Sequence, residues 1–152
     1  MSARIIEGRL RWFLLVLAGL MCLGTIIELW LTEHTEEPIQ FLPFILCGAG
    51  FVTIVAVGFR PQRWTIIALR LVMGAVVLGS LFGTFEHVKS NVAFELEIRP
   101  NAALGNVFGD ALHGATPLMA PGILALMAII AIASTYYHPA LGNRQNDSTS
   151  RG

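Results

Sequence analysis

Charged side chains are scarce in this chain of 152 residues, which has ten lysines and arginines and ten aspartates and glutamates. Together they make up 13% of the residues, about half the share found in soluble globular domains. The formal net charge is zero, so the sequence predicts no nucleic-acid partner. Hydrophobic residues make up 55% and the mean hydropathy is +0.67, which together indicate a protein that resides in a lipid bilayer.

Cysteine is also rare. Cys22 and Cys47 lie inside apolar runs, form no CxxC pair and lack the spacing of a zinc site. A disulfide framework and a structural zinc site are therefore not expected. Counting residues places the two thiols at similar depth, which leaves a redox pair as an alternative, but core packing is the favoured interpretation.

The sequence also lacks the motifs of common catalytic sites. It has no serine–histidine nucleophile pair, no glycine-rich phosphate loop and no haem attachment motif. An enzyme is thus the less favoured function class, although these absences leave the question open.

Four apolar runs predict an all-α membrane protein, a bundle of four transmembrane helices. Their ranges are 10–31, 41–59, 64–87 and 118–137. At 1.5 Å per residue the first is about 33 Å long, enough to cross a hydrocarbon core of about 30 Å. Trp12 and Trp30 mark its two ends, where amphipathic rings favour the interface. Residues 1–141 are expected to form one domain, and the polar residues 142–152 a disordered tail.

The longest polar stretch, residues 88–116, predicts a small cap between the third and fourth spans. Residues 92–99 alternate apolar and polar side chains, which indicates an extended segment ended by Pro100. Asn101 is the expected N-cap and Gly114 the expected stop of a short interfacial helix. Its expected apolar face consists of Leu104, Val107, Phe108, Ala111 and Leu112.

Basic residues predict the orientation. One side of the membrane would carry Arg4, Arg9, Arg11, Arg60, Arg63, Arg144 and Arg151. The other would carry Lys89 and Arg99. Both termini are therefore expected in the cytoplasm and the cap outside, in an inner or plasma membrane, with a bacterial origin favoured by the small size.

An offset of 59 residues aligns Leu10-Arg11 with Leu69-Arg70, and a duplicated helical hairpin is one explanation. The alignment puts Arg70 level with Arg11 at the cytoplasmic boundary. We therefore expect the Arg70 side chain to extend toward the headgroups.

Small residues recur every four positions in the third span, at Ala75, Gly79 and Gly83. Such a stripe lets helices approach closely in lipid. It predicts either contacts within one bundle, which we favour, or the seam of a homo-oligomer.

Acidic and imidazole side chains gather at the outer edge of the predicted bundle. The candidate ligands are Glu28, His34, Glu86, His87 and His113. Glu28 lies about one turn inside its span, where an ionised carboxylate is costly unless it has a partner. Carboxylate and imidazole together suit a divalent transition metal such as zinc, iron, manganese or copper. The simpler interpretation is that these polar side chains meet the lipid headgroups.

Three functions remain open on this basis. The favoured one is a non-catalytic accessory, structural or regulatory protein that meets a membrane-protein partner or lipid through its acidic, histidine-bearing outer face. The second is a metal or proton site built from the five candidate ligands. The third is a small oligomeric transporter with Glu28 as the coupling carboxylate.

Overall fold

The computed structural model describes residues 3–35, 37–114 and 119–142, in which helices are joined by turns and short loops and there is no strand. Four long helices form the body: α1 (Ala3–Leu31), α2 (Phe41–Phe59), α3 (Arg63–Ile98) and α5 (Met119–Ser134). Three short elements lie between or after them: η1 (Pro38–Gln40), α4 (Leu104–Ala111) and η2 (Pro139–Leu141).

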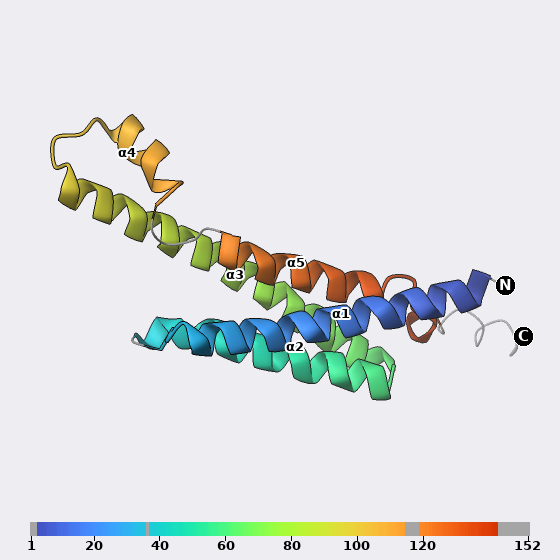
Figure 1. The fold of residues 1–152 in the computed structure, drawn as a ribbon. Coiled ribbons are helices and arrows are strands. Elements are labelled where there is room, and N and C mark those ends of the chain that lie inside the picture. The colour runs from blue at the N-terminus through green and yellow to red at the C-terminus, as the bar shows by residue number, and fades with distance from the viewer. Residues whose placement is uncertain (1–2, 36, 115–118, 143–152) are drawn as a thin grey trace, which may run out of the picture.

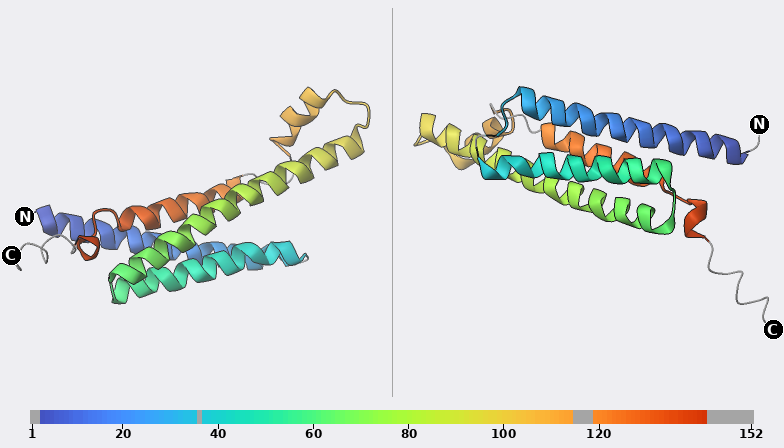
Figure 2. Two further views of the ribbon diagram at one scale, coloured as in Figure 1. Left: turned by 180° about the vertical axis from the view of Figure 1, so that it is seen from behind. Right: turned by 90° about the horizontal axis from the view of Figure 1, so that it is seen from below.

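The four long helices pack in the cyclic order α1, α2, α3, α5, each one touching two neighbours. Helix α1 begins at the end of the bundle where α5 finishes, here called the terminal end (Figure 1). The opposite end, near which α3 carries α4, is here called the cap end. Past the bundle, α3 projects alone with α4 against it (Figure 2).

The centre of the bundle is apolar and closely packed. Both cysteines are free thiols with no exposed surface, and the Cys22 thiol lies 3.5 Å from the sulfur of Met127. Other fully buried side chains are Ile66, Leu69, Met73 and Val76. Large apolar side chains on the outer faces, such as Leu20, Val52 and Leu71, are exposed in the isolated chain. An apolar interior with an apolar exterior is the arrangement expected of a bundle in lipid.

Three helices are long and apolar enough to cross a membrane: α1, α2 and α3. The predicted spans 10–31 and 41–59 correspond closely to the apolar part of α1 and to α2. Helix α5 is also apolar but has 16 residues, about 24 Å. The prediction of a helical membrane protein is confirmed at this coarser level.

The predicted extended segment at residues 92–99 is wrong, because α3 continues as a helix to Ile98. The predicted third span, residues 64–87, is therefore only the first part of a helix of 36 residues, about 54 Å long. Asn91, Glu95 and Arg99 follow one another at intervals of four, so they share a helical face. Helix α4 packs on that face. The alternation of apolar and polar residues at 92–99 matched an extended segment and so did not indicate a helical face.

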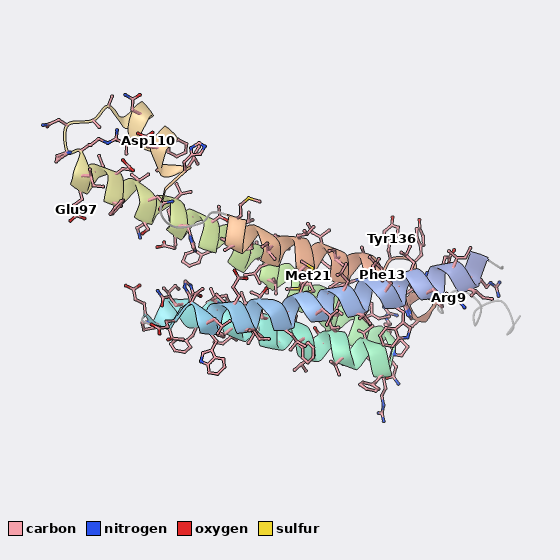
Figure 3. All side chains as sticks on the ribbon, viewed as in Figure 1. Arg9, Phe13, Met21, Glu97, Asp110 and Tyr136 are labelled. Atoms are coloured by element: carbon pink, nitrogen blue, oxygen red, sulfur yellow. The ribbon has the colours of Figure 1, made fainter. Side chains whose placement is uncertain are left out.

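Helix α4 is fixed to this face by polar contacts. The buried Asn91 amide donates a hydrogen bond of 3.0 Å to the carbonyl oxygen of Ala111. The Arg99 guanidinium pairs with both Glu95 and Asp110, and these partners raise its pKa, the Glu95 hydrogen bond contributing most. Asp110 can be seen facing the end of α3 (Figure 3).

The short helix itself was predicted, but its boundaries differ. It is capped by Ala103 rather than Asn101, and it ends at Ala111, three residues before Gly114. Val107 and Ala111 are buried against α3 as expected of its apolar face, whereas Phe108 and Leu112 are exposed. Gly114 is needed for a different reason, because a Cβ atom there would lie 2.5 Å from the Asn91 side chain.

Two arginines donate hydrogen bonds to residues that follow α5 at the terminal end. Arg70 donates two hydrogen bonds of 3.0 Å to Thr135, to its hydroxyl and its carbonyl oxygen, and Arg11 donates one of 2.9 Å to the carbonyl of Tyr137. Both cations thus bind the carbonyl end of α5, where the helix dipole favours positive charge. The level placement of Arg11 and Arg70 is consistent with the sequence alignment. The Arg70 side chain, however, binds within the bundle instead of extending to the headgroups.

Candidate functional site

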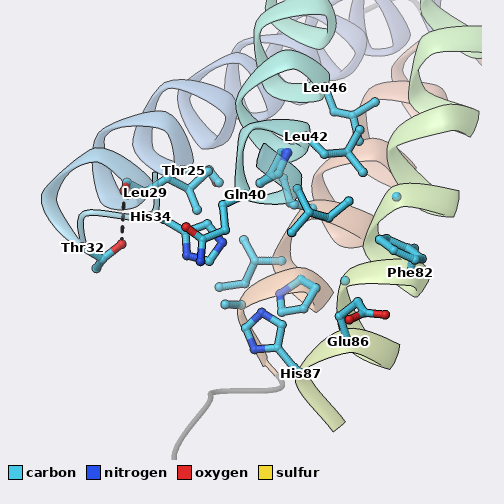
Figure 4. Close-up of a pocket in the computed structure, with 18 of the residues that line it drawn as sticks. Thr25, Leu29, Thr32, His34, Gln40, Leu42, Leu46, Phe82, Glu86 and His87 are labelled. Carbon is cyan, nitrogen blue, oxygen red and sulfur yellow. Dashed lines mark hydrogen bonds between the residues drawn. The ribbon is translucent and has the colours of Figure 1, made fainter. Parts of the chain in front are cut away.

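A cavity of about 460 Å³ opens at the cap end, where the α1–α2 pair parts from the α3–α5 pair (Figure 4). We call it the acid-lined cavity. Its ionisable lining residues are Glu28, His34, Glu37, Glu86 and His87. Its apolar lining includes Leu42, Leu46, Phe82, Pro121, Ile123 and Leu124. Four of the five side chains that the sequence nominated as ligands therefore line one cavity.

The turn that ends α1 brings His34 back toward Glu28. The amide of His34 donates to the carbonyl of Leu29 at 3.0 Å, and that of Glu33 to Trp30 at 3.2 Å. These two bonds define a Schellman motif, whose left-handed position is usually glycine. Here it is Glu33, with φ of 51°. The reversal places His34 on the cavity side, although six residues separate it from Glu28.

The next turn adds two residues that the sequence argument did not select. Pro38 opens the single turn η1, and Gln40 is its third residue. The Gln40 side-chain oxygen accepts a 3.2 Å hydrogen bond from the amide of Glu37. This hydrogen bond holds Glu37 and Gln40 in one turn, and both residues line the cavity together with His34. The signal was present as Glu-Pro-x-Gln, a capping-box spacing at the start of a helix.

Helix α3 supplies the opposite wall. Phe82, Glu86 and His87 lie within little more than one turn of one another, and all three line the cavity. Glu86 also pairs with Lys89 at 3.2 Å, with both side chains partly exposed. Exposed pairs at this spacing contribute little to stability, and their charges remain available to a ligand.

The floor of the cavity is formed by close helix contacts. A Cβ atom on Gly79 would collide with the end of the Leu46 side chain on α2, and one on Gly83 would lie 3.4 Å from Pro121 on α5. Beside them the buried Ser80 hydroxyl donates a hydrogen bond to the carbonyl of Pro121. The stripe is thus engaged within the bundle at Gly79 and Gly83, while Ala75 is exposed.

His113 lies away from this group. It follows α4, and its Nδ1 atom is 3.2 Å from the carbonyl oxygen of Gly109. It does not line the acid-lined cavity, unlike the other four candidates. Within residues 3–35, 37–114 and 119–142, no three histidine, cysteine, aspartate or glutamate side chains are grouped closely enough to hold a metal ion.

Charge and polarity are unevenly distributed in the cavity. Glu28, Glu37 and Glu86 bring three carboxylates, and no lysine or arginine is among the described lining residues. Within the described chain, the Glu28 carboxylate makes neither an ion pair nor a hydrogen bond. Most of the remaining surface is aliphatic or aromatic. Chemically, this is an anionic rim over an apolar floor.

Comparison with known proteins provides no further guide to this site. Neither a family model, nor a curated protein, nor a solved structure matches the chain.

Proposed function

We propose that this chain is a small, non-catalytic membrane protein that binds a positively charged species in the acid-lined cavity. One observation supports this most directly: three carboxylates and two imidazoles from α1, the following turns and α3 line a single cavity. A cavity of about 460 Å³ is in the size range of small-molecule sites. Binding of this species would give the protein an accessory or regulatory role. The protein would act in the bilayer, beside a membrane-protein partner.

In this proposal α5 is the fourth transmembrane span. It packs against both α1 and α3 along the bundle, so it shares their surroundings despite its shorter length. Its carbonyl end is bound by Arg11 and Arg70, which would lie at one membrane boundary.

We place the terminal end in the cytoplasm and the cavity at the outer edge. The α2–α3 turn, which carries Arg60 and Arg63, lies at the same end as the start of α1 (Figure 2). Basic residues therefore collect at one end of the bundle, as the positive-inside rule requires. The cap end has Lys89 and Arg99 beside a larger number of acidic groups.

A metal or proton site is the second candidate, favoured by the presence of His34 and His87 in the same cavity as Glu28 and Glu86. Imidazole and carboxylate would suit a divalent transition metal. A metal would need these side chains, which lie apart in the described structure, to move toward one another. His113 would have to cross from the cap to join them.

Transport through the bundle receives less support. Inward of the cavity floor, the described core consists of fully buried apolar side chains such as Cys47, Val76 and Met127. A cation that enters at Glu28 would meet this core rather than a polar path. Transport with Glu28 as coupling residue would thus demand a large rearrangement or a pathway between copies.

Thiol labelling tests whether the cavity is open and negative. Thr25 lines its α1 wall, and both native cysteines are buried, so Thr25→Cys is made in a Cys22→Ala/Cys47→Ala background. We expect a cationic methanethiosulfonate to react several-fold faster than an anionic one, and Glu28→Gln to reduce that ratio. Asn101→Cys, on the exposed cap loop, is the control. Equal rates for both reagents at position 25 and at the control would refute the proposal.

Metal content separates the second candidate from the first. The protein is purified in detergent without chelators, and its metals are measured by mass spectrometry beside a Glu28→Gln/His87→Ala variant. Stoichiometric metal that is lost in the variant would establish the metal site. If the protein contains no metal but the cationic reagent still reacts faster at position 25, the ligand is an organic cation or a proton rather than a metal ion.

A further inference from the structure

We propose that the ligand of the acid-lined cavity is an amphipathic organic cation, held with its charge at the carboxylates and its apolar body on the cavity floor. This inference rests on the proposed function and narrows it to one chemical class. It follows from the cavity's apolar lining and from the sign of the charge around it.

The apolar part of the cavity is too extensive for a bare ion. Leu42 and Leu46 on α2 face Phe82 on α3, and Ile123 and Leu124 on α5 complete the surface. Small hydrated ions gain nothing from such a lining, because they would lose water without finding new polar partners. An aliphatic or aromatic body gains about 25 cal/mol for each Å² of surface removed from water.

The polar part selects the sign of the charge. Glu28, Glu37 and Glu86 lie on three different segments, so a charge between them is approached from several sides. The Glu28 carboxylate makes no ion pair or hydrogen bond within the described chain, and Glu28 lies in a helix able to cross a membrane. A ligand cation would supply the counter-charge that a carboxylate at this depth favours. An anion would meet three negative charges.

The aromatic ring of Phe82 adds to this preference. It is 42% exposed, lines the cavity and lies one turn from Glu86 on α3. A cation within about 6 Å of a ring centroid is attracted to the ring face, most strongly when water is excluded. A ring next to a carboxylate thus favours a cation with little hydration, such as a quaternary ammonium or phosphonium.

Two matched probes separate charge from hydrophobicity. Tetraphenylphosphonium and tetraphenylborate have nearly the same size and apolar surface, but opposite charge. Binding is measured by equilibrium dialysis against the protein in nanodiscs of zwitterionic phosphatidylcholine, with empty nanodiscs subtracted. We expect saturable binding of the cation at one site per chain, at least tenfold tighter than any binding of the anion.

Paired variants locate the site. Glu28→Gln should weaken binding of the cation about tenfold, equivalent to about 1.4 kcal/mol. Glu97→Gln removes the same charge from an exposed position outside the cavity, near the end of α3 that projects past the bundle (Figure 3), and should change binding less than twofold. Leu46→Phe should weaken binding by filling the floor, whereas Ile45→Phe, on the lipid-facing side of α2, should not.

Several results would overturn the inference. These are equal binding of the two probes, binding that does not saturate above the empty nanodiscs, or equal effects of Glu28→Gln and Glu97→Gln. If Glu28→Gln fails to fold, Glu86→Gln takes its place with the same expectation. If the binding experiments fail but the thiol labelling still shows a preference for the cationic reagent, the proposed function stands and only the assignment of an amphipathic organic cation as the ligand is withdrawn. Failure of both would remove the proposed function as well.

Discussion

At the scale of single residues, the site depends on local turn chemistry as much as on side-chain type. The sequence nominated Glu28, His34, Glu86 and His87 as candidate ligands at one edge of the bundle, and all four line the acid-lined cavity. That Glu28 and His34 line the same cavity did not follow from helical periodicity, because they would lie on different faces of a continuous helix. A left-handed Glu33 reverses the chain between them. Glutamate gives no sequence signal for that conformation, which is normally marked by glycine or asparagine.

The strained turn leads to a first prediction. Glu33→Gly should increase the free energy of unfolding by about 1 kcal/mol, because a left-handed conformation costs about that much for a residue with a Cβ atom. Glu33→Ala keeps the Cβ atom and should give no such gain. Thermal unfolding in detergent compares the two variants. A gain for alanine as large as that for glycine would show that removal of the glutamate charge, not relief of strain, is responsible.

Arg70 supports a second prediction. Its two hydrogen bonds reach Thr135, which is 1% exposed, so Arg70→Ala leaves a buried hydroxyl and carbonyl without their charged donor. Hydrogen bonds that involve a charged group contribute about 1.5–3 kcal/mol, and we expect a loss of stability in that range. Arg63→Ala, at the exposed start of α3, is the matched control and should change the melting temperature little. Equal losses in both variants would argue against the contact.

His138 makes stability depend on pH. Burial, followed by the nearby positive charges of Arg11 and Arg70, lowers the pKa of this imidazole below its ordinary value of 6.5. Its Nδ1 atom accepts a 3.2 Å hydrogen bond from the amide of Ala140, which requires that nitrogen to be unprotonated. The unfolded chain therefore takes up a proton at a higher pH than the folded chain does. Stability is complete above about pH 6.5 and is lost as the pH falls toward the lower folded pKa.

The measurement is thermal unfolding between pH 7.5 and 5 for the natural chain and for His138→Asn. Asparagine keeps an acceptor for the Ala140 amide but does not titrate. The natural chain should lose more stability on acidification than the variant, and parallel curves would assign the pH dependence to other groups.

At the scale of elements, periodicity located the apolar helices and failed where α3 leaves the bundle. The alternation at residues 92–99 indicated an extended segment, yet helix pairs at i,i+3 and i,i+4 were also present in Glu86–Lys89 and Glu95–Arg99. The decisive interaction is tertiary, since α4 packs on the face that carries Asn91, Glu95 and Arg99. A partner 20 residues away in the chain is not visible in a local pattern.

That packing predicts how the cap can be released. Asn91→Leu removes the donor to the Ala111 carbonyl and should detach α4 while the bundle stays folded. Hydrogen exchange followed by mass spectrometry should show faster exchange at residues 104–111 and unchanged protection in α2. Gly114→Ala should act in the same direction, because its Cβ atom would collide with Asn91. Unchanged exchange in α4 for both variants would contradict this account of the cap.

At the scale of the whole molecule, the helices differ in length by more than a factor of two. Helix α3 is about 54 Å long and the described part of α5 about 24 Å, against a hydrocarbon core of about 30 Å. The composition predicted the membrane and the helical class, but it could not predict that α3 would continue as a helix to Ile98 and so exceed the described part of α5. The acid-lined cavity lies beside the first turns of α5.

With α5 as the proposed fourth span, its shorter described length predicts a preference for thin bilayers. In phosphatidylcholine vesicles of increasing acyl length, the melting temperature should be highest in the shorter lipids and fall by several degrees in the longer ones. Mismatch costs a fraction of a kcal/mol per Å, so the trend should be gradual. A melting temperature that rises with acyl length would show that α5 does not set the membrane thickness around the protein.

A short helix on one flank also has consequences beyond the chain itself. With α5 as the proposed fourth span, lipids beside it would tilt or compress to cover its apolar surface, and the resulting thinning of the bilayer would cost elastic energy in proportion to its extent. Two thinned regions that overlap would cost less than two that are separate, so copies of the protein would be drawn together through the deformed lipid before any side chains touch. Crowding in such thin patches would then depend on the surrounding lipid as much as on the amino-acid sequence.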